Sequence, residues 1–274
     1  MKHLKFFIIL LIPFFLLSCD ELLNAEGELD ETKVVEGLKT ALEIGTDSSC
    51  TSLNKEDAFY KTAFKILLPP EGDVLMDNLE ILKNNQYTQL VYNHLDEQIE
   101  NVVLGVNRSV EDAADDAKPI FIDAITTMTV EDGISILQGV RIDSTGTKSA
   151  TNEFDSIAAT HYLEYKTRTG LTEVFSPIID KVLEKDLGLG FSANTAWSEL
   201  VTYYNNDVTQ VALGYTNVAE TGKIEEVSLG THAVIKALDA IFNLVGNQER
   251  LIRKDPYQWA VDIIQDIFGY VYEE

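Results

Sequence analysis

The sequence predicts an all-α protein, an irregular multi-helix bundle of roughly eight to ten helices with at most a small β-hairpin in an insertion. Apolar residues recur every three or four positions along most of the chain, whereas runs with a period of two are short and lack a partner run. No repeat of fixed period indicates a solenoid. The chain has 274 residues, 45% of them hydrophobic, which is enough for one full-sized core.

Residues 1–18 have the pattern of a signal peptide. Lys2 and Lys5 precede a run of twelve apolar residues that ends at Leu17, whereas a helix needs about 20 such residues to cross a bilayer. The tetrad Leu16-Leu17-Ser18-Cys19 resembles the bacterial lipobox, in which the cysteine receives lipid and becomes the mature N-terminus. We therefore expect Cys19 to anchor the protein on the periplasmic side of a membrane, with the outer membrane favoured over the inner.

Residues 19–32 are predicted to be an acidic tether, and residues 33–274 a single helical domain. The tether is polar and rich in Asp and Glu, which is typical of a solvated linker. The whole chain has 45 acidic and 21 basic residues, a formal charge of −24. Because phosphates would repel such a protein, its charge argues against nucleic acid as a partner. Contact with the membrane is expected only through the N-terminal lipid.

In the first half of the domain, the helices are predicted from the spacing of apolar residues and from the positions of glycine and proline. Gly45 is predicted to end the first helix, and Pro69-Pro70 to separate it from the next. Pro119 is predicted to open a new helix, because its ring fits the first turn and disrupts a helix interior. Helices are thus expected over residues 32–45, 73–83, 87–104, 119–128 and 129–137.

In the second half, Gly170 is predicted to separate two helices, the second of which Pro177 could kink. Asp255 and Pro256 have the pattern of an N-cap and a first helical residue, so they are predicted to start the last helix. Its inward face would include Trp259 and Phe268. Helices are expected over residues 154–169, 171–185, 193–205, 231–254 and from 256 onward.

Across nearly the whole mature chain, the sequence resembles the bacterial lipoproteins grouped as domain of unknown function 4197. The resemblance implies a helical fold and an envelope location, and it implies no chemistry. Relative to that family, residues 140–157 look like an insertion rich in Ser, Thr, Gly and Asp, which predicts a surface loop or small hairpin. The motifs that carry the resemblance are Glu36–Lys39, Ala41-Leu42, Asp57–Tyr60, Lys65–Pro69, Asn107-Arg108, Glu111, Ala114, Asp123–Ile125, Met128-Thr129, Ala159-Thr160, Tyr162, Phe175, Pro177-Ile178, Trp197, Leu200, Tyr204-Asn205, Lys236–Phe242, Glu249, Arg253, Asp255-Pro256 and Phe268-Gly269.

The family resemblance marks one set of charged residues, Arg108, Asp123, Glu249 and Arg253, as the candidate site. They carry both signs of charge within segments predicted to be helical. Two interpretations are open. The four residues form a buried ion-pair network that holds helices in register, or they form the polar floor of a ligand pocket.

Other candidate motifs favour structural roles. Glu111-Asp112 and Asp115-Asp116 are predicted to form a solvated acidic helix face. Cys50 is predicted to be an inert small residue, because no histidine lies near it in sequence. His94, His161 and His232 are dispersed, which is typical of surface or core positions, although a fold could still gather them. The sequence predicts no metal site and no cofactor.

Two functional hypotheses remain. The first is a non-enzymatic binding or scaffold lipoprotein that holds an envelope protein, or a small apolar ligand between its helices. It rests on the absence of a motif that pairs a nucleophile with a base, and on abundant aromatic residues. The second is a hydrolase of envelope material in which carboxylates such as Asp57 or Glu249 act as acid and base.

Overall fold

The computed structural model describes residues 29–131, 133–143, 145, 147–149, 153–214, 216 and 222–272. Within these ranges it has nine α-helices and no strand, which confirms the predicted all-α fold. The signal peptide and Cys19 lie outside the described residues. The helices are α1 (Glu31–Leu53), α2 (Asp73–Lys83), α3 (Gln89–Thr127), α4 (Gly133–Leu137), α5 (Ala158–Leu183), α6 (Ala193–Asn205), α7 (Asp207–Gly214), α8 (Leu229–Lys254) and α9 (Asp262–Tyr272), with 3-10 turns η2 (Pro70–Gly72) and η3 (Pro256–Gln258).

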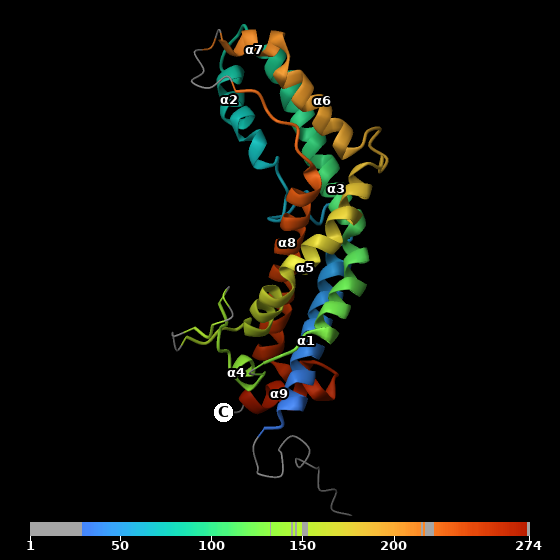
Figure 1. Cartoon of the computed structure of the whole chain (residues 1–274), viewed down its shortest axis with the longest axis vertical. Coiled ribbons are helices and arrows are strands. Elements are labelled where there is room, and N and C mark those ends of the chain that lie inside the picture. Colours follow the sequence, from blue (N-terminus) through green and yellow to red (C-terminus); the bar gives the residue numbers. More distant parts are fainter. Residues whose placement is uncertain are drawn as a thin grey trace, which may run out of the picture.

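The molecule is elongated and curved, with α3 running through most of its length (Figure 1). In one half, α1, α5, α8 and the second half of α3 pack together, and α4 and α9 close the end. In the other half, α2 and α6 pack on the first part of α3, and α7 lies at the tip. The start of α1 lies at the α9 end, and α7 lies at the opposite end of the molecule (Figure 1).

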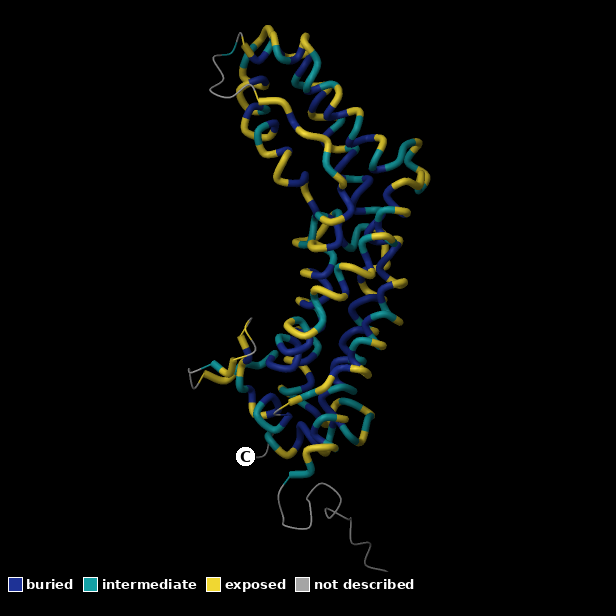
Figure 2. Tube along the Cα trace, viewed as in Figure 1, coloured by how far each residue is buried: buried dark blue, intermediate teal, exposed yellow. Residues whose placement is uncertain are grey.

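Buried residues follow the long axis of the molecule through both halves (Figure 2). They belong to one continuous apolar cluster, in which Leu38, Phe121 and Val245 represent the half near α9. Trp197 and Tyr204 fill the other half, and the Tyr204 hydroxyl accepts a hydrogen bond from Nδ2 of Asn78 at 3.0 Å. The two halves therefore share one continuous apolar core among the described residues.

The prediction that Pro119 opens a helix is wrong, because α3 runs without interruption from Gln89 to Thr127. Proline lacks the N–H that would bond the carbonyl of Asp115. Both residues lie on the exposed face, so that carbonyl can reach water. Phe121 and Ile125 are fully buried on the opposite face, and this packing outweighs the local cost of the proline.

Two glycines that were predicted to end helices lie inside them. Gly45 is within α1, where a Cβ atom would lie 3.2 Å from Cγ1 of Val245, so the glycine permits close packing of α1 on α8. Gly170 lies within α5, which continues through Pro177 to Leu183. Since glycine costs only about 1 kcal/mol in a helix interior, tertiary contacts override it.

The last helix also differs from the prediction. Asp255 and Pro256 start only the 3-10 turn η3, without a capping hydrogen bond from the Asp255 side chain, and α9 begins at Asp262. Trp259 therefore precedes the helix and is only half-buried. Phe268 is fully buried as predicted.

None of the helices in the described part of the chain is both long and apolar enough to cross a bilayer.

Candidate functional site

The four charged residues predicted to form one site are divided among three places. Arg108 on α3 belongs to one network, and Glu249 and Arg253 on α8 form another. Asp123 is exposed and lines a separate groove between α3 and α5, of about 560 Å³, together with Glu131 and Lys166. The single polar floor suggested by the sequence is therefore not formed.

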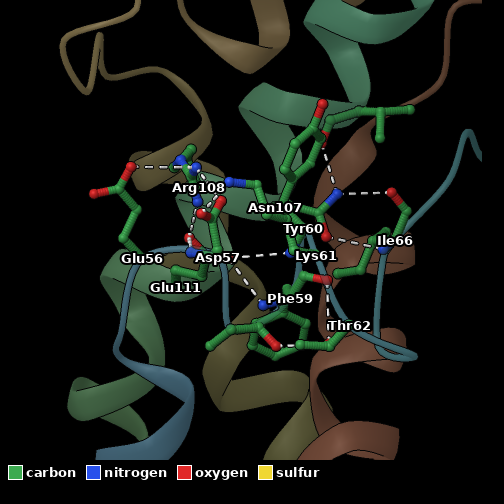
Figure 3. Close-up of polar contacts among 12 residues, drawn as sticks. Glu56, Asp57, Phe59, Tyr60, Lys61, Thr62, Ile66, Asn107, Arg108 and Glu111 are labelled. Atoms are coloured by element: carbon green, nitrogen blue, oxygen red, sulfur yellow. Dashed lines mark hydrogen bonds and ion pairs between the residues drawn. The ribbon is translucent and has the colours of Figure 1, made fainter.

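The first network holds the loop that follows α1 against α3 (Figure 3). Glu111 is 4% exposed, and its carboxylate accepts hydrogen bonds from the backbone N–H groups of Asp57 at 3.1 Å, Phe59 at 2.9 Å and Tyr60 at 3.2 Å. The prediction that Glu111 belongs to a solvated acidic face is wrong, because the loop covers it. A carboxylate saturated in this way holds a backbone and is not a free acid or base.

Arg108 joins Glu111 to Asp57, with ion pairs of 2.5 Å to each carboxylate. Asp57 has a left-handed backbone conformation, with φ of 68°, which fixes a sharp turn. Hydrogen bonds from Lys61 and Arg108 lower the pKa of Asp57. Its role is to hold the turn, so the geometry gives it no catalytic partner.

The second network completes the ends of two helices. Glu249 is 1% exposed and accepts hydrogen bonds from the N–H groups of Ala159 at 3.0 Å and Thr160 at 2.7 Å, in the first turn of α5. Arg253 bonds Glu249 at 2.9 Å and donates to the carbonyls of Ile136 and Leu137 at the end of α4. The interpretation as an ion-pair network that holds helices in register fits this geometry.

Outside these networks, two kinds of space exist between the elements. The first is a narrow apolar crevice between α3, α5 and α8, lined by Phe59, Ala113 and Leu238 among others, with a volume of about 20 Å³. That volume has room for about one water molecule, so the crevice is too small for an apolar ligand.

The second space is an open cleft of about 1060 Å³, here termed the insertion cleft, between the first half of α5 and described residues of the insertion, which are Arg141, Ile142, Asp143, Thr147, Lys148, Ser149, Glu153, Phe154 and Asp155. An isolated antiparallel bridge between Ile142 and Lys148 shapes one wall, which fits the predicted loop or hairpin. Phe154 is 65% exposed and Tyr165 is 39% exposed on its walls. Charged side chains of both signs line it: Arg141, Asp143, Lys148, Glu153, Glu164 and Arg168.

Asp155 and His161 form a pair in the insertion cleft, with 2.6 Å between Oδ2 of Asp155 and Nδ1 of His161. Burial acts to raise the pKa of Asp155, but the hydrogen bonds from His161 and the Ile157 N–H outweigh it and lower that pKa. The ionised carboxylate is therefore the acceptor, and Nδ1 carries the hydrogen. Nε2 of His161 has no hydrogen-bond partner among the residues that the structure describes.

The second network, Glu249 and Arg253, also supports the pair of Asp155 and His161. Glu249 fixes the first turn of α5, which carries His161, and Arg253 fixes the end of α4, two residues before Gly139. Gly139 has φ of 78°, and its carbonyl accepts the N–H of Asp155 at 2.8 Å. The Phe154 ring occupies the space that a Cβ of Gly139 would need. Asp155 and His161 are thus both positioned by segments that the buried ion pair of Glu249 and Arg253 holds.

Sequence reasoning missed the pair because it treated His161 as isolated from other chemistry-bearing residues. Asp155 lies only six residues earlier, but it lies in a segment predicted to be a surface insertion. A usable signal was present, since an acid shortly before a helix often bonds groups in the first turn.

Two further observations concern the Cys50 thiol and possible metal ligands. Burial raises the pKa of the Cys50 thiol to about 12, which fits the predicted inert role. Among the residues that the structure describes, no three His, Cys, Asp or Glu side chains are grouped to hold a metal ion.

One family model matches the chain, over residues 28–269, and its description is a protein of unknown function (DUF4197). No curated protein and no solved structure matches.

Proposed function

The chain belongs to the DUF4197 family of proteins of unknown function, and from that premise we propose that it is a lipid-anchored binding protein of the bacterial cell envelope. In this proposal, Cys19 carries the lipid, and the insertion cleft holds a polypeptide segment of an envelope partner. The observation that carries the proposal is the cleft itself, an open space of about 1060 Å³ with exposed aromatic rings and charges of both signs.

The chemistry of the cleft favours a polypeptide over a small apolar ligand. Exposed aromatic rings offer large contact areas, and charged groups of both signs can pair with the mixed side chains and backbone groups of a peptide. The apolar crevice, which would be the natural site for an apolar ligand, has only about 20 Å³.

The order of segments along the chain supports the anchor. The family match begins at residue 28 and α1 begins at Glu31, so the predicted signal peptide and most of the tether precede the body. A chain with a formal charge of −24 would be repelled by an anionic bilayer, so stable membrane attachment needs the lipid.

The two carboxylates nominated for the hydrolase alternative, Asp57 and Glu249, are both engaged in structural contacts. Both oxygens of Glu249 accept hydrogen bonds in a site that is 1% exposed, and Asp57 is paired with Arg108 and Lys61. Neither carboxylate faces the insertion cleft.

A photo-crosslinking experiment in intact cells tests the binding role. Replacing Tyr165 in the full-length chain by p-benzoylphenylalanine should give a discrete, protease-sensitive adduct. The same replacement at Tyr87, which is 84% exposed in the turn before α3 and outside the cleft, is the matched control and should not give it.

A second pair of variants distinguishes binding in the insertion cleft from nonspecific crosslinking at Tyr165. Thr169→Trp places a bulky group on the cleft wall and should abolish the Tyr165 adduct, whereas Thr202→Trp on α6 should leave it unchanged. The absence of a Tyr165 adduct, an adduct that survives Thr169→Trp, or an adduct that resists protease would each overturn the proposal.

A further inference from the structure

We infer that the insertion cleft is also a hydrolytic site, in which the Asp155–His161 pair acts as a general base toward a carboxylic ester. The inference goes beyond the binding role, because it assigns a reaction to the cleft. Its general base is neither of the carboxylates nominated from the sequence, because Asp57 is paired with Arg108 and Lys61, and Glu249 binds N–H groups in the first turn of α5.

The first step is the orientation of the imidazole. A carboxylate that binds Nδ1–H fixes the ring and its tautomer, and it leaves Nε2 as the basic nitrogen. Asp155 and His161 have this arrangement at 2.6 Å, and the second carboxylate oxygen of Asp155 accepts the Ile157 N–H at 3.0 Å. The side chain of His161 is 23% exposed on the cleft wall, so a bound molecule can reach it.

The second step is rigidity, since a general base must be held in place to be effective. Asp155 is tied through its own N–H to Gly139, and His161 lies in the helical turn whose N–H groups bond Glu249. The buried pair of Glu249 and Arg253 therefore supports both members of the pair. We assign Asp155, Glu249 and Arg253 as positioning residues.

The third step is a positive charge for the oxyanion. Arg141 lines the same cleft, and its charge contributes to the lowered pKa of Asp155, so the guanidinium lies near the pair. Arg168 also lines the cleft, but it is paired with Glu164 at 2.7 Å and with Asp239 at 2.9 Å. Arg141 is therefore the better candidate to stabilise developing negative charge.

The reaction follows from these placements. The oxygen of a water molecule bonds to the ester carbonyl carbon while Nε2 of His161 takes one of its protons, and the carbonyl oxygen becomes an oxyanion near Arg141. The bond between that carbon and the leaving oxygen then breaks, and the imidazolium returns the proton to the leaving oxygen. The products are a carboxylic acid and an alcohol, and no redox partner is needed.

The test uses the full-length chain in detergent with p-nitrophenyl acetate as the probe. The expected result is saturable hydrolysis that falls at least about 100-fold in His161→Gln. His94→Gln is the matched control, since His94 is exposed on α3 outside the cleft, and it should leave the rate unchanged. Free imidazole also cleaves this ester, so saturation and the dependence on position are both required.

Two further variants keep the test informative if His161→Gln unfolds. With added imidazole, His161→Ala should regain saturable hydrolysis above the rate of imidazole alone, which a collapsed protein would not do. Asp155→Asn should lower kcat with little change in KM, because it misorients the base without blocking the cleft.

The absence of saturable hydrolysis, or equal rates in wild type and folded His161→Gln, would overturn the hydrolytic inference. The Tyr165 adduct would still test the binding role separately. Loss of that adduct together with retained hydrolysis would instead overturn the proposed function alone.

Discussion

Glu249 and Arg253 form a buried ion pair on α8, with 2.9 Å between Oε1 of Glu249 and Nε of Arg253, and each side chain completes the end of a different helix. The glutamate binds N–H groups at the start of α5, and the arginine binds carbonyls at the end of α4. Because the N-cap residue of α5 makes no side-chain capping hydrogen bond, Glu249 supplies that function, and the pair couples three helices at one point.

We predict that Glu249→Gln destabilises the protein by about 3–5 kcal/mol, because it leaves the guanidinium of Arg253 buried without its charge partner. Chemical denaturation followed by circular dichroism would measure the change. The matched control is Asp239→Asn, whose ion pairs lie on the surface and should contribute less than about 1 kcal/mol. Equal losses in the two variants would contradict a special role for the buried pair.

The pH dependence of stability should change in Asp57→Asn. The folded-state pKa of Asp57 is lowered, so its ion pairs stabilise the fold above the unfolded pKa of about 4 and are lost as the pH falls through the folded value. Asn also tolerates the left-handed φ of 68°, so the substitution removes charge without adding backbone strain.

Stability measured from pH 7 down to pH 2 should therefore show a difference between wild type and Asp57→Asn that is largest near neutral pH and shrinks in acid. Asp116→Asn, at an exposed position on α3, is the control and should show a small difference at every pH. A wild-type curve parallel to that of Asp57→Asn would show that the ion pairs do not contribute.

Cys50 should resist alkylation in the native protein. With a pKa of about 12, the thiolate fraction at pH 8 is about 10⁻⁴, so reaction with iodoacetamide should be roughly a thousandfold slower than for an ordinary cysteine. Mass spectrometry of the Cys50 peptide with and without denaturant would measure this. Rapid labelling under native conditions would mean that α1 opens locally.

Cys19→Ala should move the protein from the membrane fraction to the soluble fraction, because the charge of the body gives it no membrane affinity of its own. Fractionation and immunoblotting of whole cells would measure the distribution. Cys50→Ser is the control for loss of a thiol and should stay in the membrane fraction. Membrane association that survives Cys19→Ala would contradict the lipid anchor.

Local patterns in the sequence predicted the helices well where periodicity and burial agree, as in α2 and α6, whose observed bounds match the predicted ranges. They failed at Gly45, Pro119 and Gly170, where long-range packing outweighs a local helix-breaking preference. The pairing of Glu249 with the start of α5 joins residues about 90 positions apart, and no local pattern reports such a contact. Asp155–His161 was missed for a different reason, since its acid lies in a segment read as a surface loop.

The C-terminal segment offers a prediction that the structure has revised. The sequence alone suggested that Trp259 fills the core and that Asp255 caps the last helix. In the structure, Phe268 is fully buried in α9, whereas Trp259 is half-buried before that helix. Phe268→Ala should therefore cost about 3–5 kcal/mol, and Trp259→Ala should cost less than about 3 kcal/mol.

Asp255→Ala provides the matching test of the cap. The side chain accepts a hydrogen bond from Nε2 of Gln258 and caps no helical N–H, so we expect a change within about 0.5 kcal/mol. Thermal and chemical denaturation of the three variants would rank them as Phe268, Trp259 and Asp255, in order of decreasing loss. A loss at Asp255 as large as that at Phe268 would show that the turn η3, rather than α9, fixes the end of the bundle against α1.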